Sequence, residues 1–211
     1  AKIDKILDLK PDLVLGFSDL QSEICSTLIN EGVNVLCFNQ RSIDEILNVI
    51  EFIGRIVNLQ EKTEQYLKGI NSNLDCIRLS SKNLKKNPKV FFEEWDDPII
   101  TGIKWVSELI EIAGGIDIFK YYSSKPNAKD RIIKNSDEVI NANPDIIFAS
   151  WCGKKLNKDK IIKRNNWHKI NAVKNNDIYE IKSPLILQPG PAALTDGVNE
   201  IHTIIKNWNS K

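Results

Sequence analysis

Three aromatic residues close short apolar runs that have the composition of buried strands. Phe17, Trp95 and Trp151 each stand at the carboxyl end of such a run. In open α/β sheets, ligands bind beyond the carboxyl ends of the strands. Aromatic walls with few charges suit a large, flat, partly apolar ligand. The pattern therefore predicts that the three rings line one cleft, closed on its C-terminal side by Leu185 and Gln188; the alternative is that the rings pack as core.

A compact acidic group surrounds the second of these rings and consists of Glu93, Glu94, Asp96 and Asp97. Hard cations need several converging oxygens, and this spacing matches no calcium loop such as the EF-hand. The default interpretation is a solvated strand end. Against that default, we predict that Glu94 and Asp96, together with Gln188, accept hydrogen bonds from amides at the rim of a ligand.

Side chains that could carry catalysis or hold a metal are few. His168 and His202 are the only histidines, and neither has a partner at ligand spacing. No dinucleotide, P-loop, serine-elbow or zinc-protease motif occurs. A nucleophile needs a base and an orienting group, so the sequence predicts a protein that is not an enzyme and has no metal site or cofactor. The cysteines make no CxxC pair, which leaves two disulfides or buried free thiols as alternatives: Cys25, Cys37, Cys76 and Cys152.

Bulk composition excludes several classes of partner. A net charge of +1 over 211 residues gives no field that would select nucleic acid or an anionic membrane. The hydrophobic content of 42% is enough for a real core and too high for disorder. No apolar run approaches the length of a membrane span. Ala1 leads straight into an amphipathic pattern without a signal peptide, so an exported protein would be seen here already trimmed.

The element that must position these residues is a long stretch without proline that ends at Pro88. Ser42 and Glu45 have the spacing of a capping box, and apolar residues then recur at helical spacing. We predict mainly one helix over Ile43–Leu84. About 40 residues in one helix would span about 60 Å, which suits a strut between two lobes. The alternative is two ordinary helices that meet near Asn71.

Strands and helices alternate on both sides of this stretch, which predicts an α/β protein. The segment 9–15 is echoed by the segment 142–148, since both contain a helix end, a Pro-Asp pair and an apolar strand. We expect two Rossmann-like lobes, divided as a partial N-terminal lobe (1–41), a connecting helix (42–86) and a C-terminal α/β lobe (87–211). Only two strands are expected before residue 40. Such a half-built lobe would expose an unpaired edge and favour a dimer or aggregation.

Taken together, these segments resemble the substrate-binding proteins of ATP-binding-cassette importers, in the subclass whose lobes are joined by one long helix, the class III periplasmic-binding-protein-like fold. The cobalamin-binding members are the most similar. The Gly-Gly-x-x-x-Phe element is fairly specific to the subclass, not to the ligand. The matching segments span nearly the whole chain: Leu9–Val14, the stretch from Ser42, Val90–Pro98, Glu108–Phe119, Asn143–Ile147 and Ser183–Gly197.

The resemblance implies a protein that captures cobalamin or a related corrinoid and delivers it to a membrane permease, in the periplasm or anchored outside the cell membrane. It implies that Phe17 and Trp95 contact the ligand and that Glu23 docks on the permease. Two departures bear on these expectations. The family's opening strand and helices do not precede Ala1, so the N-lobe is expected to be truncated. An arginine expected near the ligand is missing from Gln188–Ala192.

Other functions remain open at this stage. A ferric-siderophore or haem carrier of the same subclass is the nearest alternative. A metal-ion carrier is disfavoured because its sites use clustered histidines. A truncated, non-catalytic interaction module is a further alternative. An enzyme built on two Rossmann-like lobes would need catalytic partners that the sequence does not show.

Overall fold

A computed structural model describes all 211 residues of the chain. The chain separates into two compact units, residues 1–40 and 41–211. The first unit ends one residue before the predicted end of the N-terminal lobe. The stretch 42–86 is part of the second unit, and its role as a connector between two lobes stays a prediction.

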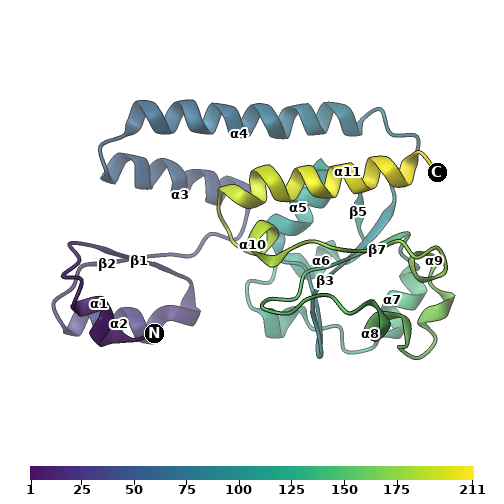
Figure 1. Cartoon of the computed structure of the whole chain (residues 1–211), viewed down its shortest axis with the longest axis horizontal. Helices are drawn as coiled ribbons and strands as arrows, with labels where there is room; N and C mark the ends of the chain where they lie inside the picture. Colours follow the sequence, from purple (N-terminus) through teal and green to yellow (C-terminus); the bar gives the residue numbers. More distant parts are fainter. The chain divides into compact units, whose positions relative to one another are not determined.

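The first unit is a two-stranded parallel sheet accompanied by short helices (Figure 1). Its strands pair in register from Val14 opposite Val35 to Phe17 opposite Phe38. Both strands were predicted, and no other strand precedes residue 40. The elements of this unit are α1 (Ile3–Leu7), β1 (Val14–Phe17), the 3-10 turn η1 (Asp19–Gln21), α2 (Ser22–Asn30) and β2 (Val35–Phe38).

The core of the first unit is small. Leu28 on α2 is its one buried hydrophobic side chain, whereas Leu9, Leu15 and Leu20 remain 79%, 48% and 88% exposed. Two strands cannot bury much apolar surface because each lacks a neighbour on one edge. The predicted exposure of apolar surface is therefore confirmed, while the association expected from it stays a prediction.

The second unit is built on a five-stranded sheet in the order β4–β3–β6–β7, with β5 paired to the start of β3. All pairs are parallel except β3 with β4. Strand β4 was not predicted; it ends at Thr101, and the next helix begins at Lys104. The strands are β3 (Lys89–Asp96), β4 (Ile99–Thr101), β5 (Ile116–Asp117), β6 (Ile146–Ala149) and β7 (Ile178–Glu180).

Helices cover both faces of this sheet (Figure 1). Because successive strand residues point to opposite faces, Val90 and Phe92 enter one buried cluster with residues of α3, α4, α5 and α11, while Phe91 enters a second cluster with residues of α7, α8 and α9. The helices and helical turns are α3 (Ile43–Ile56), α4 (Gln60–Ser81), α5 (Lys104–Ile112), α6 (Lys120–Ser123), η2 (Ala128–Arg131), α7 (Asp137–Ala142), α8 (Lys158–Ile162), η3 (Trp167–Lys169), α9 (Asn171–Lys174), α10 (Ser183–Ile186), the π-helical turn η4 (Ala193–Gly197) and α11 (Val198–Asn209).

The stretch that was predicted as one helix is two helices, α3 and α4. The predicted capping box of Ser42 and Glu45 opens α3. The break comes at Asn58, which has a left-handed φ of 57°, and Leu59 N–H donates to the Gly54 carbonyl at 2.8 Å. This is the Schellman way of ending a helix, with asparagine in the position usually taken by glycine. The single helix and the alternative junction near Asn71 were both wrong.

Gly54 allows the two helices to approach closely. Helices α3 and α4 lie side by side as an antiparallel pair (Figure 1). A Cβ atom at Gly54 would lie 2.0 Å from Oγ1 of Thr63 on α4, a separation that atoms do not tolerate. Glycine at this position therefore serves the contact between α3 and α4. No helix of the chain has the combined length and apolarity that a membrane crossing requires.

Candidate functional site

The carboxyl end of β3 concentrates charged and aromatic side chains. Pairing with β4 shifts register between Glu93 and Trp95, which is the signature of a β-bulge. A bulge re-aims the side chains that follow it. Here it directs Glu93 and Asp96 toward cations from the segment that follows β6, while Glu94 turns to Arg131 on η2.

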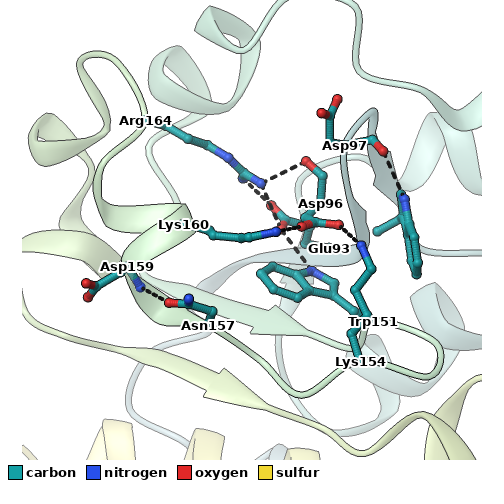
Figure 2. A network of polar contacts seen from close by, with 10 residues as sticks. Glu93, Asp96, Asp97, Trp151, Lys154, Asn157, Asp159, Lys160 and Arg164 are labelled. Carbon is teal, nitrogen blue, oxygen red and sulfur yellow. Dashed lines mark hydrogen bonds and ion pairs between the residues drawn. The ribbon is translucent and has the colours of Figure 1, made fainter.

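Glu93 is a buried carboxylate held by two donors (Figure 2). Both of its oxygens accept from the Arg164 guanidinium, and Oε1 also accepts from the indole N–H of Trp151 at 3.1 Å. Burial raises the pKa of Glu93, and the bonds from Arg164 and Trp151 only partly oppose that rise. The guanidinium also donates to the Asp96 carbonyl at 3.0 Å, so one arginine fixes both ends of the bulge.

Asp96 binds two lysines from the segment that follows β6. Its Oδ1 lies 2.8 Å from Nζ of Lys154, and its Oδ2 lies 2.9 Å from Nζ of Lys160. Burial alone would raise the pKa of this carboxyl, but the two lysine contacts outweigh burial and lower the pKa to about 2. The carboxylate is almost fully enclosed, whereas the two ammonium groups stay partly in solvent.

Glu94 forms a two-pronged ion pair on the other side of the strand. Arg131, which is 2% exposed, donates to its two oxygens at 2.6 and 3.1 Å and also to the Thr101 carbonyl. A bidentate pair of this kind is rigid and geometrically specific. It ties the turn η2 to β3 and β4 directly behind the bulge.

Trp95 is the half-buried ring of this edge. Its indole N–H donates to the Asp97 carbonyl at 2.9 Å, and Nζ of Lys154 lies 3.7 Å from the ring centroid. An ammonium over an indole face at this distance is a cation–π contact. Glu93, Glu94 and Asp96 are bound to cations, and none of them has a nucleophile beside it, so the arrangement suits binding and not acid–base chemistry.

The chain matches the periplasmic binding protein family over residues 1–185. It belongs to this family. The family consists of substrate-binding, non-catalytic components of transporters, which carry no cofactor because the ligand is the transported substrate. The α/β fold of the chain is of the class III periplasmic-binding-protein-like type.

Two curated relatives are similar over most of the chain. The uncharacterized ABC transporter substrate-binding lipoprotein YvrC of Bacillus subtilis is 29% identical over 95% of this chain and 64% of the relative. The high-affinity heme uptake system protein IsdE of Staphylococcus aureus is 25% identical over 85% of this chain and 63% of the relative. The chain thus spans just under two thirds of the length of these relatives.

Solved structures share the fold. The structure of IsdE complexed with heme superimposes with a TM-score of 0.79 at 21% identity, over 96% of this chain and 80% of that one. The vitamin B12 binding protein BtuF of Vibrio cholerae gives a TM-score of 0.69 at 22% identity, over 99% of this chain and 79% of that one. At this level of identity the likeness is one of fold alone.

Within this family member, several of the predicted ligand residues are already engaged. Trp151 is 4% exposed and packs in the second core cluster. Its indole N–H donates to Glu93, so the side chain presents no open face to a ligand. Glu94 and Asp96 are bound to Arg131 and to two lysines, and their role as acceptors for ligand amides stays a prediction. The interpretation of the acidic group as a solvated strand end was wrong for Glu93, Glu94 and Asp96, whose carboxylates are paired with cations, and holds for Asp97, which is exposed.

The remaining predicted residues are placed without being tested. Phe17 ends β1 in the first unit, half-buried, and Glu23 is exposed in the first turn of α2. Leu185 is half-buried on α10, and Gln188 is exposed just beyond it. Both follow β7 and leave from the carboxyl side of the sheet. Roles in ligand binding for Phe17, Trp95, Leu185 and Gln188, and in docking for Glu23, stay predictions.

The cations of this site were missed. Lys154, Lys160 and Arg164 all lie in the segment that follows β6, and Arg131 lies on η2. Lys160 and Arg164 are four residues apart, the spacing that places two side chains on one helix face. That spacing was the available signal, but it carried no information about which carboxylates the cations would meet.

Proposed function

We propose that the protein to which this chain belongs is the solute-binding component of an ABC importer. It captures cobalamin or a related corrinoid outside the cell membrane and delivers it to the membrane permease. Membership of the periplasmic binding protein family and the similarity to YvrC, which is named as a substrate-binding lipoprotein, support the importer role and the extracytoplasmic location. The comparisons give no support to a dimer, which is therefore not part of the proposal.

One observation carries the choice of ligand. Trp95 offers a half-buried indole at the carboxyl end of β3, where ligands of open α/β sheets bind; the ammonium group of Lys154 lies over its ring, and that of Lys160 binds the neighbouring Asp96. A corrin has broad apolar faces and a rim of amides. The indole can bury part of such a face, and the two lysines can donate to amide carbonyls.

Haem is the second candidate, because IsdE is named a heme uptake protein. Haem iron requires an axial ligand from the protein, commonly histidine or methionine. The chain contains no methionine. His202 is buried, with both ring nitrogens engaged at 2.9 Å by the Ala113 carbonyl and the Ser80 hydroxyl. His168 on η3 is exposed and could supply such a ligand, so haem stays an alternative and the choice of a corrinoid rests on Trp95.

The test is a titration followed by visible absorption and by calorimetry, with cyanocobalamin, haemin and a ferric hydroxamate as separate ligands. Trp95→Ala is expected to weaken corrinoid binding by about 2 kcal/mol, which is roughly thirtyfold in Kd. Trp95→Phe is the matched control and should retain most of the affinity. Binding of haemin or the hydroxamate but not of cobalamin would reject the ligand. Equal affinity of wild type and Trp95→Ala for cobalamin would reject the site.

The delivery step needs a separate measurement. Glu23→Ala should leave cobalamin affinity unchanged and reduce uptake by cells that depend on this importer. A loss of affinity in Glu23→Ala would contradict its assignment to docking. Failure of every ligand to bind the complete protein would favour the non-catalytic interaction module over a carrier.

A further inference from the structure

The first unit brings two cysteines together in space although eleven residues separate them in the chain. Cys37 lies on β2, directly opposite Gly16 on β1 in the parallel ladder. Cys25 lies on α2, which packs against β2. The helix side chain and the strand side chain therefore converge over the same point of the sheet.

Gly16 makes the space in which the two sulfurs meet. A Cβ atom at this glycine would lie 3.0 Å from Sγ of Cys25 and 3.4 Å from Sγ of Cys37. The sulfurs are thus no farther apart than the sum of these distances. Burial, followed by the proximity of Cys25, raises the pKa of Cys37, whose thiol donates to the Ser18 carbonyl at 3.7 Å. Any larger side chain at Gly16 would occupy the place where the sulfurs approach.

The pair is accessible to a small reagent. Cys25 is partly exposed and Cys37 is exposed. Both border a cavity of about 510 Å³ on the first unit, whose lining also includes Ser22 and Ser26 of α2. A thiol–disulfide exchange needs room for the incoming disulfide and for the thiol that leaves. This cavity provides that room.

We propose that Cys25 and Cys37 are a dithiol that closes to an intramolecular disulfide by exchange with a low-molecular-weight disulfide. One cysteine thiolate attacks a sulfur of the reagent, forms a mixed disulfide and releases the first small thiol. The second cysteine thiolate attacks the protein sulfur of the mixed disulfide and releases the second small thiol. The protein loses two protons and two electrons, and the reagent gains both as two thiols.

Apolar burial within the first unit, residues 1–40, is small. Leu28 is its one buried hydrophobic side chain, so apolar burial contributes little to holding α2 on the sheet. Small units with little core are commonly stabilised by disulfides. A bond from Cys25 to Cys37 joins α2 covalently to β2. The inference does not depend on which ligand the carrier takes.

The two other cysteines can be replaced by serine so that only Cys25 and Cys37 remain to react. Cys76 lies on α4 and Cys152 follows β6, both exposed and both in the second unit. In the full chain carrying Cys76→Ser and Cys152→Ser, the reduced protein should show two alkylatable thiols. After incubation with glutathione disulfide and removal of the reagent, it should show none, with a mass lower by two hydrogens.

Peptide mapping assigns the link. Trypsin leaves both cysteines on one peptide, because neither lysine nor arginine lies between them, whereas cleavage after Glu31 separates them. A disulfide would keep the two products of Glu31 cleavage joined until reduction. Stable glutathione adducts on one or both cysteines, or two thiols that remain alkylatable, would overturn the proposal.

A variant of the glycine tests the geometry independently. Gly16→Ala, in the same Cys76→Ser and Cys152→Ser background, places a methyl group between the sulfurs and should convert closure into stable glutathione adducts. Full closure in Gly16→Ala would show that the space at Gly16 does not govern the reaction. If Gly16→Ala fails to fold, the thiol count and the peptide map of the protein with Gly16 decide the proposal.

Discussion

Two stretches of the chain share a local pattern and lie in different surroundings. In the first, Lys10 has a left-handed φ of 47° before Pro11 and leads into β1; in the second, Asn143 has a φ of 48° before Pro144 and leads into β6. The helix end, the left-handed residue and the Pro-Asp entry to the strand are the same. The burial that follows is not: Leu15 on β1 is 48% exposed, whereas every residue of β6 is fully buried.

The difference comes from the neighbours of each strand. β1 pairs only with β2, whereas β6 lies between β3 and β7 and is covered by helices on both faces. A strand pattern fixes local backbone conformation, but the free energy of burial depends on what packs against it. The same pattern therefore makes a marginal element in one unit and the centre of a core in the other.

The largest expected effect tests this contrast with a pair of matched truncations. Phe148→Ala on β6 should lower the free energy of unfolding of the second unit by about 3–5 kcal/mol, because it opens a cavity in a closed core. Leu15→Ala, at the equivalent position of β1, should cost less than about 1 kcal/mol, since its side chain is half in water. Similar costs at the two positions would contradict the comparison.

The tryptophans make the measurement specific to one unit. All five lie in the second unit, so urea unfolding followed by tryptophan fluorescence reports on that unit. Far-UV circular dichroism reports on both units. Leu15→Ala should leave the fluorescence transition, which reports on the second unit, unchanged. It should shift only the change in dichroism that comes from unfolding of the first unit.

The charged edge of the second unit should make its stability sensitive to acid. The pKa of Asp96 is lowered from 3.8 to about 2 in the folded chain. A depressed carboxyl pKa adds stability above the unfolded pKa, and that stability is lost as pH falls toward the folded pKa. Asp96→Asn should therefore cost up to about 2 kcal/mol at pH 7, and the difference from wild type should shrink to near zero as pH falls from 4 to 2.

Urea midpoints followed by tryptophan fluorescence at several pH values check this prediction. The raised pKa of Glu93 has the opposite sign: the stability it gives is present below its unfolded pKa and is lost as pH rises through its folded pKa. The Asp96 charge is one cause of that rise, so the rise is smaller in Asp96→Asn. Below the unfolded pKa of Glu93 its carboxyl is protonated in both proteins, so it does not affect the difference measured between pH 4 and 2. A pH-independent difference between the two would show that the lysine contacts do not stabilise the Asp96 carboxylate.

The aspartates of the repeated pattern give a smaller, sharper comparison. Asp145 accepts the Lys89 backbone N–H at 2.9 Å and joins β6 to the start of β3. Asp145→Ala should cost about 1–2 kcal/mol, because it leaves a strand-entry donor without its partner. Asp12→Ala should stay within about 0.5 kcal/mol, since the Asp12 bond to Asn34 uses the backbone carbonyl and survives the substitution. Chemical unfolding of both variants measures the two losses in free energy of unfolding. A larger loss in Asp12→Ala than in Asp145→Ala would contradict this expectation.

The smallest effect concerns the left-handed residues themselves. Lys10→Gly should stabilise the first unit by about 0.5 kcal/mol, because glycine adopts positive φ without the steric cost that lysine bears. Asn143→Gly gains the same relief but loses the bond in which Oδ1 accepts the Asn171 N–H at 2.8 Å. It should be neutral or slightly destabilising. If thermal unfolding shows equal gains in stability for Lys10→Gly and Asn143→Gly, the hydrogen bond of the Asn143 side chain does not stabilise the folded chain.

Local chemistry was sufficient to predict most elements from the sequence. The strands β1, β3 and β6 fall where short apolar runs were found, β2 is the second strand expected before residue 40, and the capping box opens α3 as expected. The break at Asn58 was missed because asparagine is a weaker signal than glycine for a left-handed helix end. Strand β4 was missed because three residues after a turn carry little periodicity of their own.

The candidate site was predicted only in part, and its long-range contacts explain why. The acidic residues and Trp95 were identified, but their partners lie far along the chain: Arg164 is 71 residues from Glu93, and Lys160 is 64 residues from Asp96. Nothing local distinguishes a carboxylate that will be buried with a cation from one that will remain in water. The expectation of a solvated strand end failed for Glu93, Glu94 and Asp96 for that reason.

The sequence by itself determined where the backbone turns, where strands begin and which family the chain resembles, because hydrophobic period, proline and capping residues act over a few positions. Tertiary structure alone decided how much burial stabilises each strand. It placed β6 between two neighbours and left β1 with one, it closed the edge of β3 with distant cations, and it brought Cys25 and Cys37 together over Gly16. Burial, ion pairing and thiol proximity each depend on distances between residues that are remote in the chain, and those distances exist only once the elements have packed.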